Sequence, residues 1–285
     1  MTFAIPGFDL ELFLTTTLAE DLGDGWPGGG RDVTSESVIP AEARFSGIMA
    51  SRDAIVVCGL PLAAAFFRRL DPGVTIEILQ PEGASVPAGT ELMRLSGLAR
   101  ALLTAERSAL NTVQHLSGIA TLTQTYVAAV AGRAILLDTR KTIPGLRHLE
   151  KYATRTGGAQ NHRLGLWDAA LIKDNHVAVA GGVGEAVARS RDAGVTSIIC
   201  EVDRLEQIEP ALSAGTTHLL LDNMGPDQLR AAVELVRGRV PCEASGGVRL
   251  ETIAEIAATG ATYVSVGRLT QSAPAADIGL DFTPL

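Results

Sequence analysis

Six short apolar runs in the second half of the chain each end in polar residues of the kind that bind anions or carry out chemistry. With the polar residues that follow them, the six runs cover residues 134–141, 169–176, 197–203, 218–223, 240–247 and 263–268. A continuous apolar run is typical of a parallel strand whose two faces are both covered by helices. The carboxyl ends of such strands meet at one rim, where parallel α/β barrels carry their active sites. The sequence therefore predicts a barrel with functional side chains at its strand ends.

Helical patterns fill the gaps between these runs. The helices are expected over residues 183–192, 205–214, 226–236 and 250–259, and the glycines that follow them are Gly194, Gly215, Gly238 and Gly260. A glycine just after the last turn supplies the left-handed residue that commonly ends a helix. Alternation of strands and helices predicts the α/β class.

The first part of the chain has a different pattern, that of a small α+β layer. Helices are expected over 8–21 and 60–70, and strands over 43–57, 74–79 and 91–95. Residues 98–131 are helical in pattern, and two helices separated near Ser117 and Gly118 are expected there. The glycine-rich stretch 23–30 does not link a strand to a helix, so it predicts a surface loop and not a nucleotide-binding fingerprint. The chain is expected to divide near residue 115.

Composition favours a cytoplasmic enzyme. Hydrophobic residues make up 46% of the chain and charged residues 20%, as in a globular protein with a large core. The net charge of −8 disfavours a nucleic-acid partner. Neither a membrane-spanning stretch nor a signal peptide is expected from the sequence. The three cysteines have no metal-binding spacing and are expected to be reduced thiols in the core.

Cationic side chains are concentrated near two of the strand ends. They are Arg140, Lys141, His162, Arg163 and Lys173. Arginine binds carboxylate or phosphate through a planar fork, and lysine supplies a point charge. Solvated surface charge is the alternative interpretation. This alternative is the less favoured one for Lys173, which directly follows an apolar strand. For Arg140 taken alone, the two interpretations are about equally favoured. A net-acidic chain with this cluster is expected to bind a small polyanion.

Two carboxylates, Glu201 and Asp222, are placed at the ends of consecutive predicted strands. Carboxylates there can hold a divalent cation, take up protons or stabilise a developing positive charge. The alternative to a functional role is a salt bridge to a lysine or an N-cap on the following helix. For Asp222, the N-cap is a serious alternative.

Glycines after the last two strands are suited to phosphate binding, because they let backbone N–H groups approach the ligand closely. They are Gly246 and Gly247, which follow Ser245, and Gly267. The histidine spacing does not support a zinc centre, and a serine-hydrolase elbow is absent from the sequence. Structural roles are expected for His115, His148 and His218.

Taken together, these motifs resemble those of the quinolinate phosphoribosyltransferase family, also called nicotinate-nucleotide pyrophosphorylases (carboxylating). The matching segments in the second half are 138–147, 150–153, 157–158, 161–166, 171–176, 221–224, 243–247 and 266–267, and those in the first half are 32–35, 104–107, 110–111 and 115–121. The resemblance implies an α/β sandwich over residues 1–115 and an open, type II phosphoribosyltransferase-like α/β barrel over residues 116–274. It also implies that the tail 275–285 packs on the sandwich.

The resemblance further implies a reaction. Quinolinate and phosphoribosyl pyrophosphate react with Mg²⁺ to give nicotinate mononucleotide, pyrophosphate and CO₂ in de novo NAD synthesis. The family works as a homodimer, or as a higher oligomer built from it, in which the other subunit's N-terminal domain completes each active site.

Residue roles follow from the matched motifs. Quinolinate is expected to contact Arg140, His162, Arg163 and Lys173, together with Arg107 donated across the dimer. The phosphates are expected to contact Lys141, Ser245, Gly246, Gly247 and Gly267. Lys141, Glu201 and Asp222 are the expected catalytic residues, and Glu201 and Asp222 are the expected Mg²⁺ ligands, directly or through water.

Departures from the family pattern fall at the phosphate end. Ile199 stands where family members often carry an acidic residue, Arg268 replaces a small residue, and Gln271 replaces a common histidine. Three alternatives stay open: a relative that uses nicotinate or serves molybdenum transport, a Schiff-base aldolase with Lys173 or Lys141 as nucleophile, and a non-catalytic anion-binding protein.

Overall fold

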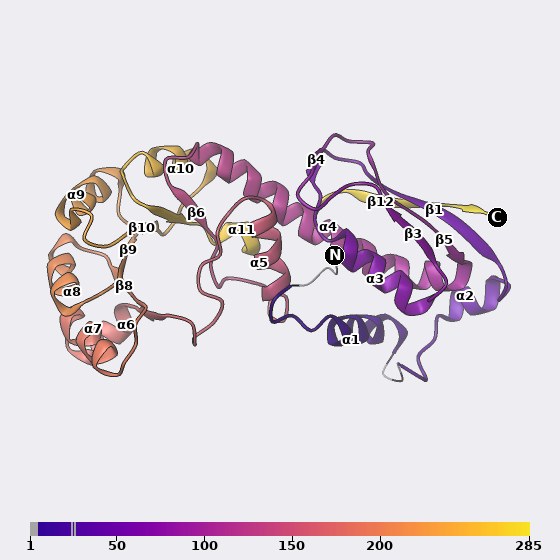
Figure 1. The fold of residues 1–285 in the computed structure, drawn as a ribbon, viewed down its shortest axis with the longest axis horizontal. Coiled ribbons are helices and arrows are strands. Elements are labelled where there is room, and N and C mark those ends of the chain that lie inside the picture. Colours follow the sequence, from indigo (N-terminus) through magenta and orange to yellow (C-terminus); the bar gives the residue numbers. More distant parts are fainter. Residues whose placement is uncertain (1–4, 24, 26) are drawn as a thin grey trace. The chain divides into compact units, whose positions relative to one another are not determined.

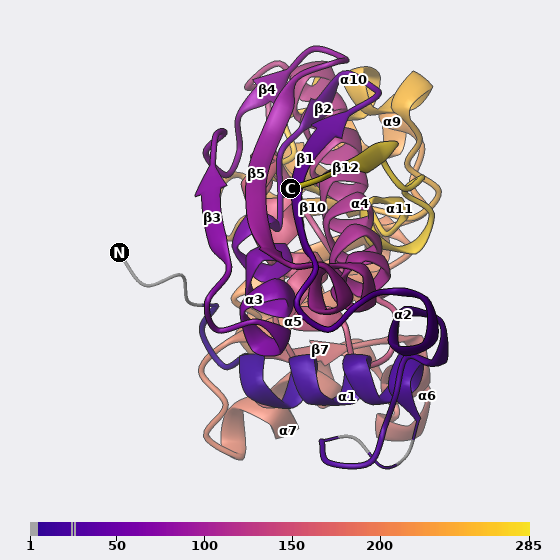
Figure 2. The same ribbon diagram turned by 90° about the vertical axis from the view of Figure 1, so that its right-hand side faces the viewer.

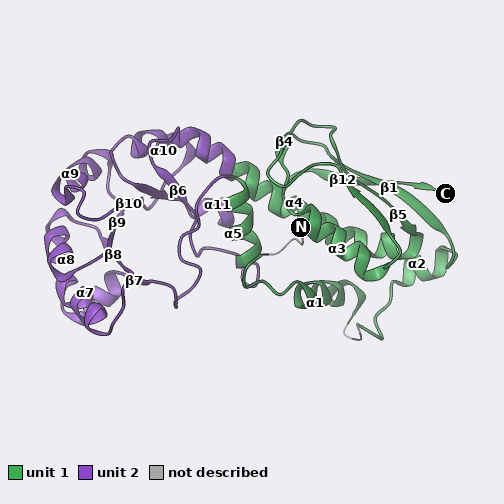
Figure 3. Cartoon of the chain, viewed as in Figure 1, with its two compact units in different colours: residues 1–122, 148–157, 273–285 green, residues 123–147, 158–272 purple. Residues whose placement is uncertain are grey.

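The computed structural model describes residues 5–23, 25 and 27–285, and these form two compact units (Figures 1 and 3). Unit 1 is built from three segments of the chain, residues 1–122, 148–157 and 273–285. Unit 2 consists of residues 123–147 and 158–272. Each unit has its own sheet and helices, so each is described by itself.

Unit 1 is an antiparallel sheet with helices along one face (Figures 1 and 2). The strand order is β12-β1-β5-β3, with β1 at Arg44–Ser51, β3 at Thr75–Ile78, β5 at Glu91–Leu98 and β12 at Ile278–Pro284. A second, two-stranded sheet pairs β2 (Ile55–Val56) with β4 (Ser85–Val86). The helices are α1 (Leu10–Leu22), α2 (Val33–Val38), α3 (Leu60–Leu70), the first part of α4 (Ala99–Val130) and nearly all of α5 (Arg147–Thr156).

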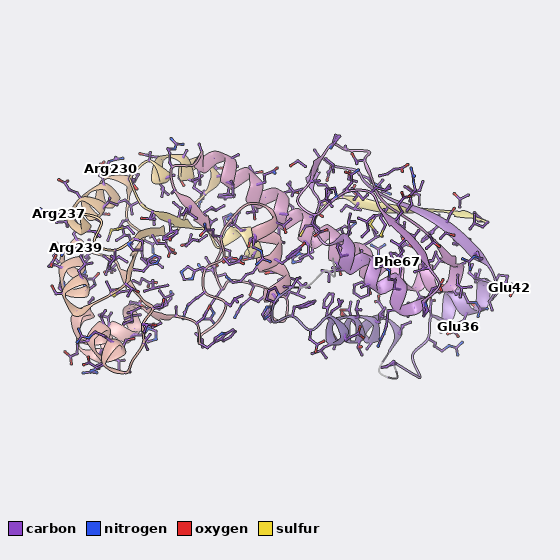
Figure 4. All side chains as sticks on the ribbon, viewed as in Figure 1. Glu36, Glu42, Phe67, Arg230, Arg237 and Arg239 are labelled. Carbon is purple, nitrogen blue, oxygen red and sulfur yellow. The ribbon has the colours of Figure 1, made fainter. Side chains whose placement is uncertain are left out.

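The core of unit 1 is made by large apolar side chains that are fully buried. Phe66 and Phe67 of α3 share this core with Met49 of β1, Met93 of β5 and Leu102 of α4. Phe67 is labelled in Figure 4. Burial of side chains of this size is worth about 1.5–3 kcal/mol each. The helix expected over 60–70 is confirmed as α3, and its buried side chains join the sheet to the helices.

Unit 2 is a six-stranded parallel sheet with helices along its outer side (Figure 1). The strand order is β6-β11-β10-β9-β8-β7, with β6 at Ile135–Leu137, β7 at Ala170–Ile172, β8 at Ile198–Val202, β9 at His218–Asp222, β10 at Cys242–Ser245 and β11 at Tyr263–Ser265. The helices are α6 (Asp174–Ala180), α7 (Val183–Asp192), α8 (Ile208–Ala214) after the short 3₁₀ turn η1 (Leu205–Gln207), α9 (Pro226–Val236), α10 (Leu250–Ala257) and α11 (Arg268–Gln271). All six predicted strands are confirmed, and the sheet is open because β6 and β7 are its two edges.

The glycines predicted after four helices of unit 2 have left-handed backbone, but only Gly215 is itself the C-cap, and in α9 the left-handed C-cap is Arg237. Gly194, Gly215, Gly238 and Gly260 all have a positive φ, between 69° and 100°. These angles are easy for glycine and costly for residues with a Cβ. The predicted helix over 205–214 is interrupted, because its first residues form the 3₁₀ turn η1 before α8 begins.

The break expected near Ser117 and Gly118 is wrong. The structure has one continuous helix there, α4, of 32 residues. Gly118 serves close packing instead: a Cβ at this position would lie 2.0 Å from the carbonyl oxygen of Pro274, which belongs to the same unit. A glycine that looks like a helix breaker in the sequence is therefore a contact point for another backbone.

The cysteines are thiols in the interior of the protein. Cys58, Cys200 and Cys242 are free and buried, as expected. Burial raises the pKa of Cys200 and Cys242 to about 11, which keeps these thiols unreactive at neutral pH. Within the described part of the chain, the length and apolarity of the helices fall short of what a membrane span needs. Asp24 and Trp26 of the expected glycine-rich loop lie outside the described residues.

We expect Gly118→Ala to destabilise the protein by about 2–3 kcal/mol, because the added methyl forces the Pro274 backbone away from α4. The matched control is Gly184→Ala in α7, where the added Cβ would meet its nearest atom at an ordinary 3.5 Å. Gly184 is in the first turn of α7, so replacing it by alanine should change the stability by less than about 1 kcal/mol. Thermal unfolding followed by circular dichroism measures both, and equal melting temperatures for the two variants would contradict the packing role of Gly118.

Candidate active site

A cavity of about 550 Å³ opens at the carboxyl ends of the strands of unit 2. Parallel pairing brings these ends together, so residues far apart in sequence line one space. The predicted site residues that line the cavity are Arg140, Lys141, His162, Arg163, Lys173, Glu201, Asp222, Ser245, Gly246 and Gly247. Two predicted residues are placed differently: Gly267 packs on Lys141 without lining the cavity, and Arg107 is exposed on α4 in unit 1.

Two arginines make the cavity suited to binding an anion. The Nε atoms of Arg140 and Arg163 are buried, and neither has a hydrogen-bond partner among the described residues. Burial, and next the charge of Arg140, lower the pKa of Arg163. Arg163 does donate from Nη1 to the carbonyl oxygen of Ala169, at 2.9 Å. A buried guanidinium nitrogen without an acceptor is costly until a carboxylate or phosphate accepts its hydrogen.

Arg147 holds the two arginine-bearing loops together, a role that the sequence did not predict. Its Nε donates to Thr142 Oγ1 at 3.1 Å, its Nη1 to the carbonyl oxygen of Leu164 at 3.2 Å, and its Nη2 to that of Arg140 at 3.4 Å. Leu164 directly follows Arg163, so one guanidinium group fixes the backbone at both cavity arginines. The fork shape of arginine suits it to bridging separate carbonyl groups in this way.

The loop after Arg163 is stabilised by its own contacts. The carboxylate of Asp168 accepts the backbone N–H groups of Leu164 at 2.6 Å and of Gly165 at 3.1 Å. Burial alone would raise the pKa of Asp168, but these two hydrogen bonds outweigh it and lower the pKa. The ring of Trp167 lies over Gly165, where a Cβ would come within 2.0 Å of the ring.

The carboxylates Glu201 and Asp222 stand at the ends of β8 and β9. Glu201 Oε2 forms an ion pair with Lys173 Nζ at 3.0 Å. Asp222 Oδ2 accepts from Asn223 Nδ2 at 2.7 Å, and the cap of the following helix, α9, is Gly225. Asp222 is therefore free of the capping role that was the alternative to a functional one.

Backbone at the ends of β10 and β11 forms the glycine-rich side of the cavity. Gly246 has a φ of 92°, and a Cβ there would lie 2.2 Å from Asn223 Oδ1. A Cβ on Gly267 would lie 2.9 Å from Lys141 Cδ. The carbonyl oxygen of Lys141 accepts from Thr270 Oγ1 at 2.7 Å, which ties this lysine to α11. Close approach and backbone conformation thus require glycine at position 246.

His162 is held from both sides by buried carboxylates. Asp138 is fully buried, and its oxygens accept the His162 N–H at 2.8 Å and Asn161 Nδ2 at 2.7 Å. On the ring side, His162 Nε2 lies 3.4 Å from Glu243 Oε2. Glu243 is fully buried and lines the cavity.

Sequence reasoning gave Glu243 no role, although a signal was present. The sheet register aligns Glu243 with Leu220 and Leu220 with Glu201, so the two glutamates lie in one row across β10, β9 and β8. Residues in register on neighbouring strands face the same side of a sheet. An acidic residue within the apolar run of β10 was therefore the sign of a third cavity carboxylate, beside Glu201 and Asp222.

Fold and cavity together define an enzyme of the parallel α/β-barrel class that acts on anionic substrates. The family models for the N-terminal and C-terminal domains of quinolinate phosphoribosyl transferase match residues 32–117 and 119–281. A nicotinate-nucleotide pyrophosphorylase [carboxylating] from Mycobacterium leprae is 44% identical over 260 residues, covering 88% of this chain and 91% of that protein. The probable nicotinate-nucleotide pyrophosphorylase [carboxylating] of a Synechocystis strain is 40% identical, covering 98% of this chain and 95% of that protein.

Solved structures agree. A crystal structure of NadC from Streptococcus pyogenes has a TM-score of 0.93 at 35% identity and covers all of both chains. The chain belongs to the quinolinate phosphoribosyltransferase family. The hypotheses of a Schiff-base aldolase and of a non-catalytic anion-binding protein find no support in these matches.

We expect Arg147→Ala to weaken binding of quinolinate, the compound in the family's name, by about 10- to 100-fold, because the backbones of Arg140 and Leu164 lose their shared donor. Arg147→Lys, which cannot bridge three acceptors in the same plane, should fall between wild type and Arg147→Ala. Arg133→Ala is the control, since Arg133 donates to the carbonyl oxygens of Val130 and Ala129 without lining the cavity. Isothermal titration calorimetry gives each Kd, and similar losses in the Arg133 and Arg147 variants would disprove the positioning role.

Proposed function

We propose that the protein transfers the phosphoribosyl group of phosphoribosyl pyrophosphate to quinolinate and removes one carboxylate, giving nicotinate mononucleotide, pyrophosphate and CO₂ in de novo NAD synthesis. The observation that carries the proposal is the pair of arginines whose buried Nε donors lack partners among the described residues, in a cavity that two strand-end carboxylates also line. A planar dicarboxylate satisfies the arginines, and the carboxylates suit a reaction in which positive charge develops on a sugar. Membership of the family supports both halves of this assignment.

Quinolinate is proposed to bind on the arginine side of the cavity. Arg140 and Arg163 each offer a planar fork, which pairs with a carboxylate more strongly than a point charge does. Lys173 lines the same cavity and adds a further positive charge. The phosphates are proposed to bind on the opposite, glycine-rich side, at Lys141, Ser245, Gly246, Gly247 and Gly267.

The proposed chemistry is a displacement at the anomeric carbon of the ribose. The ring nitrogen of quinolinate forms a bond to that carbon as the bond to the pyrophosphate oxygen breaks, and positive charge builds on the sugar. Glu201 and Asp222 stabilise this charge electrostatically, and Lys141 stabilises the negative charge on the departing group. The resulting pyridinium then accepts the electron pair of the carbon–carboxylate bond, CO₂ leaves, and a proton from water takes its place on the ring.

The donor set fits Mg²⁺, which is proposed as the cofactor. Clusters of three or more metal-binding side chains are absent from the described residues, so the protein does not offer a complete metal cage there. Mg²⁺ is commonly bound by one or two carboxylates, with phosphate oxygens and water filling the other positions. Glu201 and Asp222 would supply such carboxylates, and the bound ion would neutralise charge on the pyrophosphate.

A homodimer with a shared active site is proposed as the working assembly, with Arg107 reaching the partner's cavity. Two observations support it. Arg107 is exposed on α4, and apolar side chains near the open edge of the barrel are exposed as well: Leu166 by 72%, Trp167 by 77% and Val179 by 89%. Large exposed apolar side chains grouped in one region are typical of protein interfaces. We also propose a cytoplasmic location, in line with the free thiols.

The central test mixes the purified protein with quinolinate, phosphoribosyl pyrophosphate and Mg²⁺. We expect nicotinate mononucleotide and CO₂ in equal amounts, and neither product when any one of the three components is left out. Liquid chromatography and release of labelled CO₂ measure the two products. Nicotinate in place of quinolinate should give no product, because it lacks the second carboxylate that the cation cluster requires. Turnover of nicotinate alone would instead assign the protein to the non-decarboxylating relatives.

We expect Arg140→Ala to raise the KM for quinolinate by about 100-fold or more, equivalent to about 3 kcal/mol, because charge-assisted hydrogen bonds to a carboxylate are lost. The melting temperature should change little, since the buried Nε of Arg140 lacks a partner among the described residues. Arg230→Ala is the control: Figure 4 shows this arginine at α9, where it pairs with Asp227. Near-normal kinetics in Arg140→Ala would remove Arg140 from the binding site.

A further inference from the structure

A fully buried carboxylate in an anion-binding cavity is an unexpected feature, and Glu243 is one. A negative charge at this position opposes binding of a dicarboxylate or a polyphosphate. Burial alone would raise the pKa of Glu243, but its contacts with His162 and His218 outweigh burial and lower the pKa to about 2. Glu243 is therefore charged at neutral pH, and the proposed reaction gives this charge no role.

Two imidazoles approach the same oxygen of Glu243. His218 Nε2 lies 3.0 Å and His162 Nε2 lies 3.4 Å from Oε2. His218 is itself held in place by stacking on Tyr263, with ring centroids 5.4 Å apart and ring planes at 22°. The side chains of both histidines are largely buried, so the contacts are shielded from solvent. Glu243 is thus the centre of a rigid group of three ionisable side chains.

The second ring nitrogen of His162, Nδ1, connects this group to Arg163. His162 Nδ1 accepts the backbone N–H of Arg163 at 2.7 Å. A neutral imidazole that accepts at Nδ1 carries its proton at Nε2, the nitrogen that faces Glu243. The carboxylate stabilises that tautomer, as carboxylates do for the histidines of many functional sites. Both nitrogens of His162 are therefore directed at the protein.

We propose that Glu243 is a positioning residue that acts through His162 on Arg163. The carboxylate fixes the tautomer and ring orientation of His162, and the ring fixes the backbone from which the Arg163 side chain enters the cavity. His218 contacts the same carboxylate oxygen. This inference rests on the proposed function, because it concerns binding of the quinolinate carboxylate. It also changes the expected role of His162, from a direct ligand of quinolinate to a support for Arg163.

The key variant is Glu243→Gln, which keeps the shape of the side chain and removes its charge. We expect the KM for quinolinate to rise by about 10- to 100-fold, with the KM for phosphoribosyl pyrophosphate within about twofold of wild type. Glu243→Asp retains the charge at a shorter reach and should recover part of the loss. His218→Gln, which keeps Glu243 charged, should give a smaller rise in the same constant. The last two variants also test the proposal if Glu243→Gln does not fold.

Nuclear magnetic resonance of ¹³C-labelled histidine supplies a readout that lost stability alone would not change. The chain has five histidines, so the His162 signals can be assigned by substituting each one in turn. In wild type, the His162 Cδ2 shift should report the tautomer protonated at Nε2, and in Glu243→Gln it should move toward a mixture. Glu150→Gln is the matched control, since buried Glu150 lies 2.9 Å from His115 Nε2. That variant should move the His115 signals and leave those of His162 in place.

Two outcomes would overturn the proposal. In the first, the His162 signals and the quinolinate KM are unchanged in Glu243→Gln. In the second, both substrate KM values rise together while the His162 signals stay in place, which would make Glu243 a purely structural residue. Failure of the proposed function is a separate result: wild type would then be inactive with quinolinate, while the tautomer of His162 could still be measured.

Discussion

Repulsion among like charges is the constraint around which unit 2 is built. Arg140, Arg163 and Lys173 line one cavity, and the two arginines are close enough for one to lower the pKa of the other. Such a cluster is tolerated only where other parts of the fold hold each cation in place and supply compensating charge. The parallel sheet places Glu201 and Glu243 in one row, where Glu201 pairs with Lys173 and Glu243 lies beside His162.

The supporting contacts are divided between backbone and side chains. Arg147 donates hydrogen bonds to backbone carbonyl groups, and Asp168 accepts them from backbone N–H groups. Asp138 accepts from the backbone N–H of His162 and from the side chain of Asn161. Since each contact restrains a different atom, the arginines approach a ligand along fixed directions. Preorganisation of this kind reduces the entropy that binding must overcome.

The sequence could predict the elements of the fold better than the contacts within it. All six strands of unit 2 were predicted, because buried parallel strands leave an uninterrupted apolar signal. Gly118 misled the prediction, since its reason for being glycine is the Pro274 carbonyl oxygen more than 150 residues away in the chain. Such a contact leaves no local pattern.

The cavity shows the same limit. Ten of the predicted site residues line it, and most of them lie in the last residues of a strand or in the loop that follows one. Arg147 and Glu243 were in matched motifs but received no role, since their importance lies in which carbonyl or imidazole they reach. Hydrogen-bond geometry is a property of the folded chain, and residue type alone does not encode it.

The sheet of unit 1 has a consequence for synthesis of the chain. β1 pairs with β12, and Ser46 is 237 residues from its partner Thr283. On the ribosome, every residue of unit 2 is made before β12 emerges, so β1 is an open strand edge throughout that time. Unpaired edges are sites of aggregation. The nascent chain is therefore most vulnerable while its barrel is being translated, and this is the interval in which a chaperone would have most to protect.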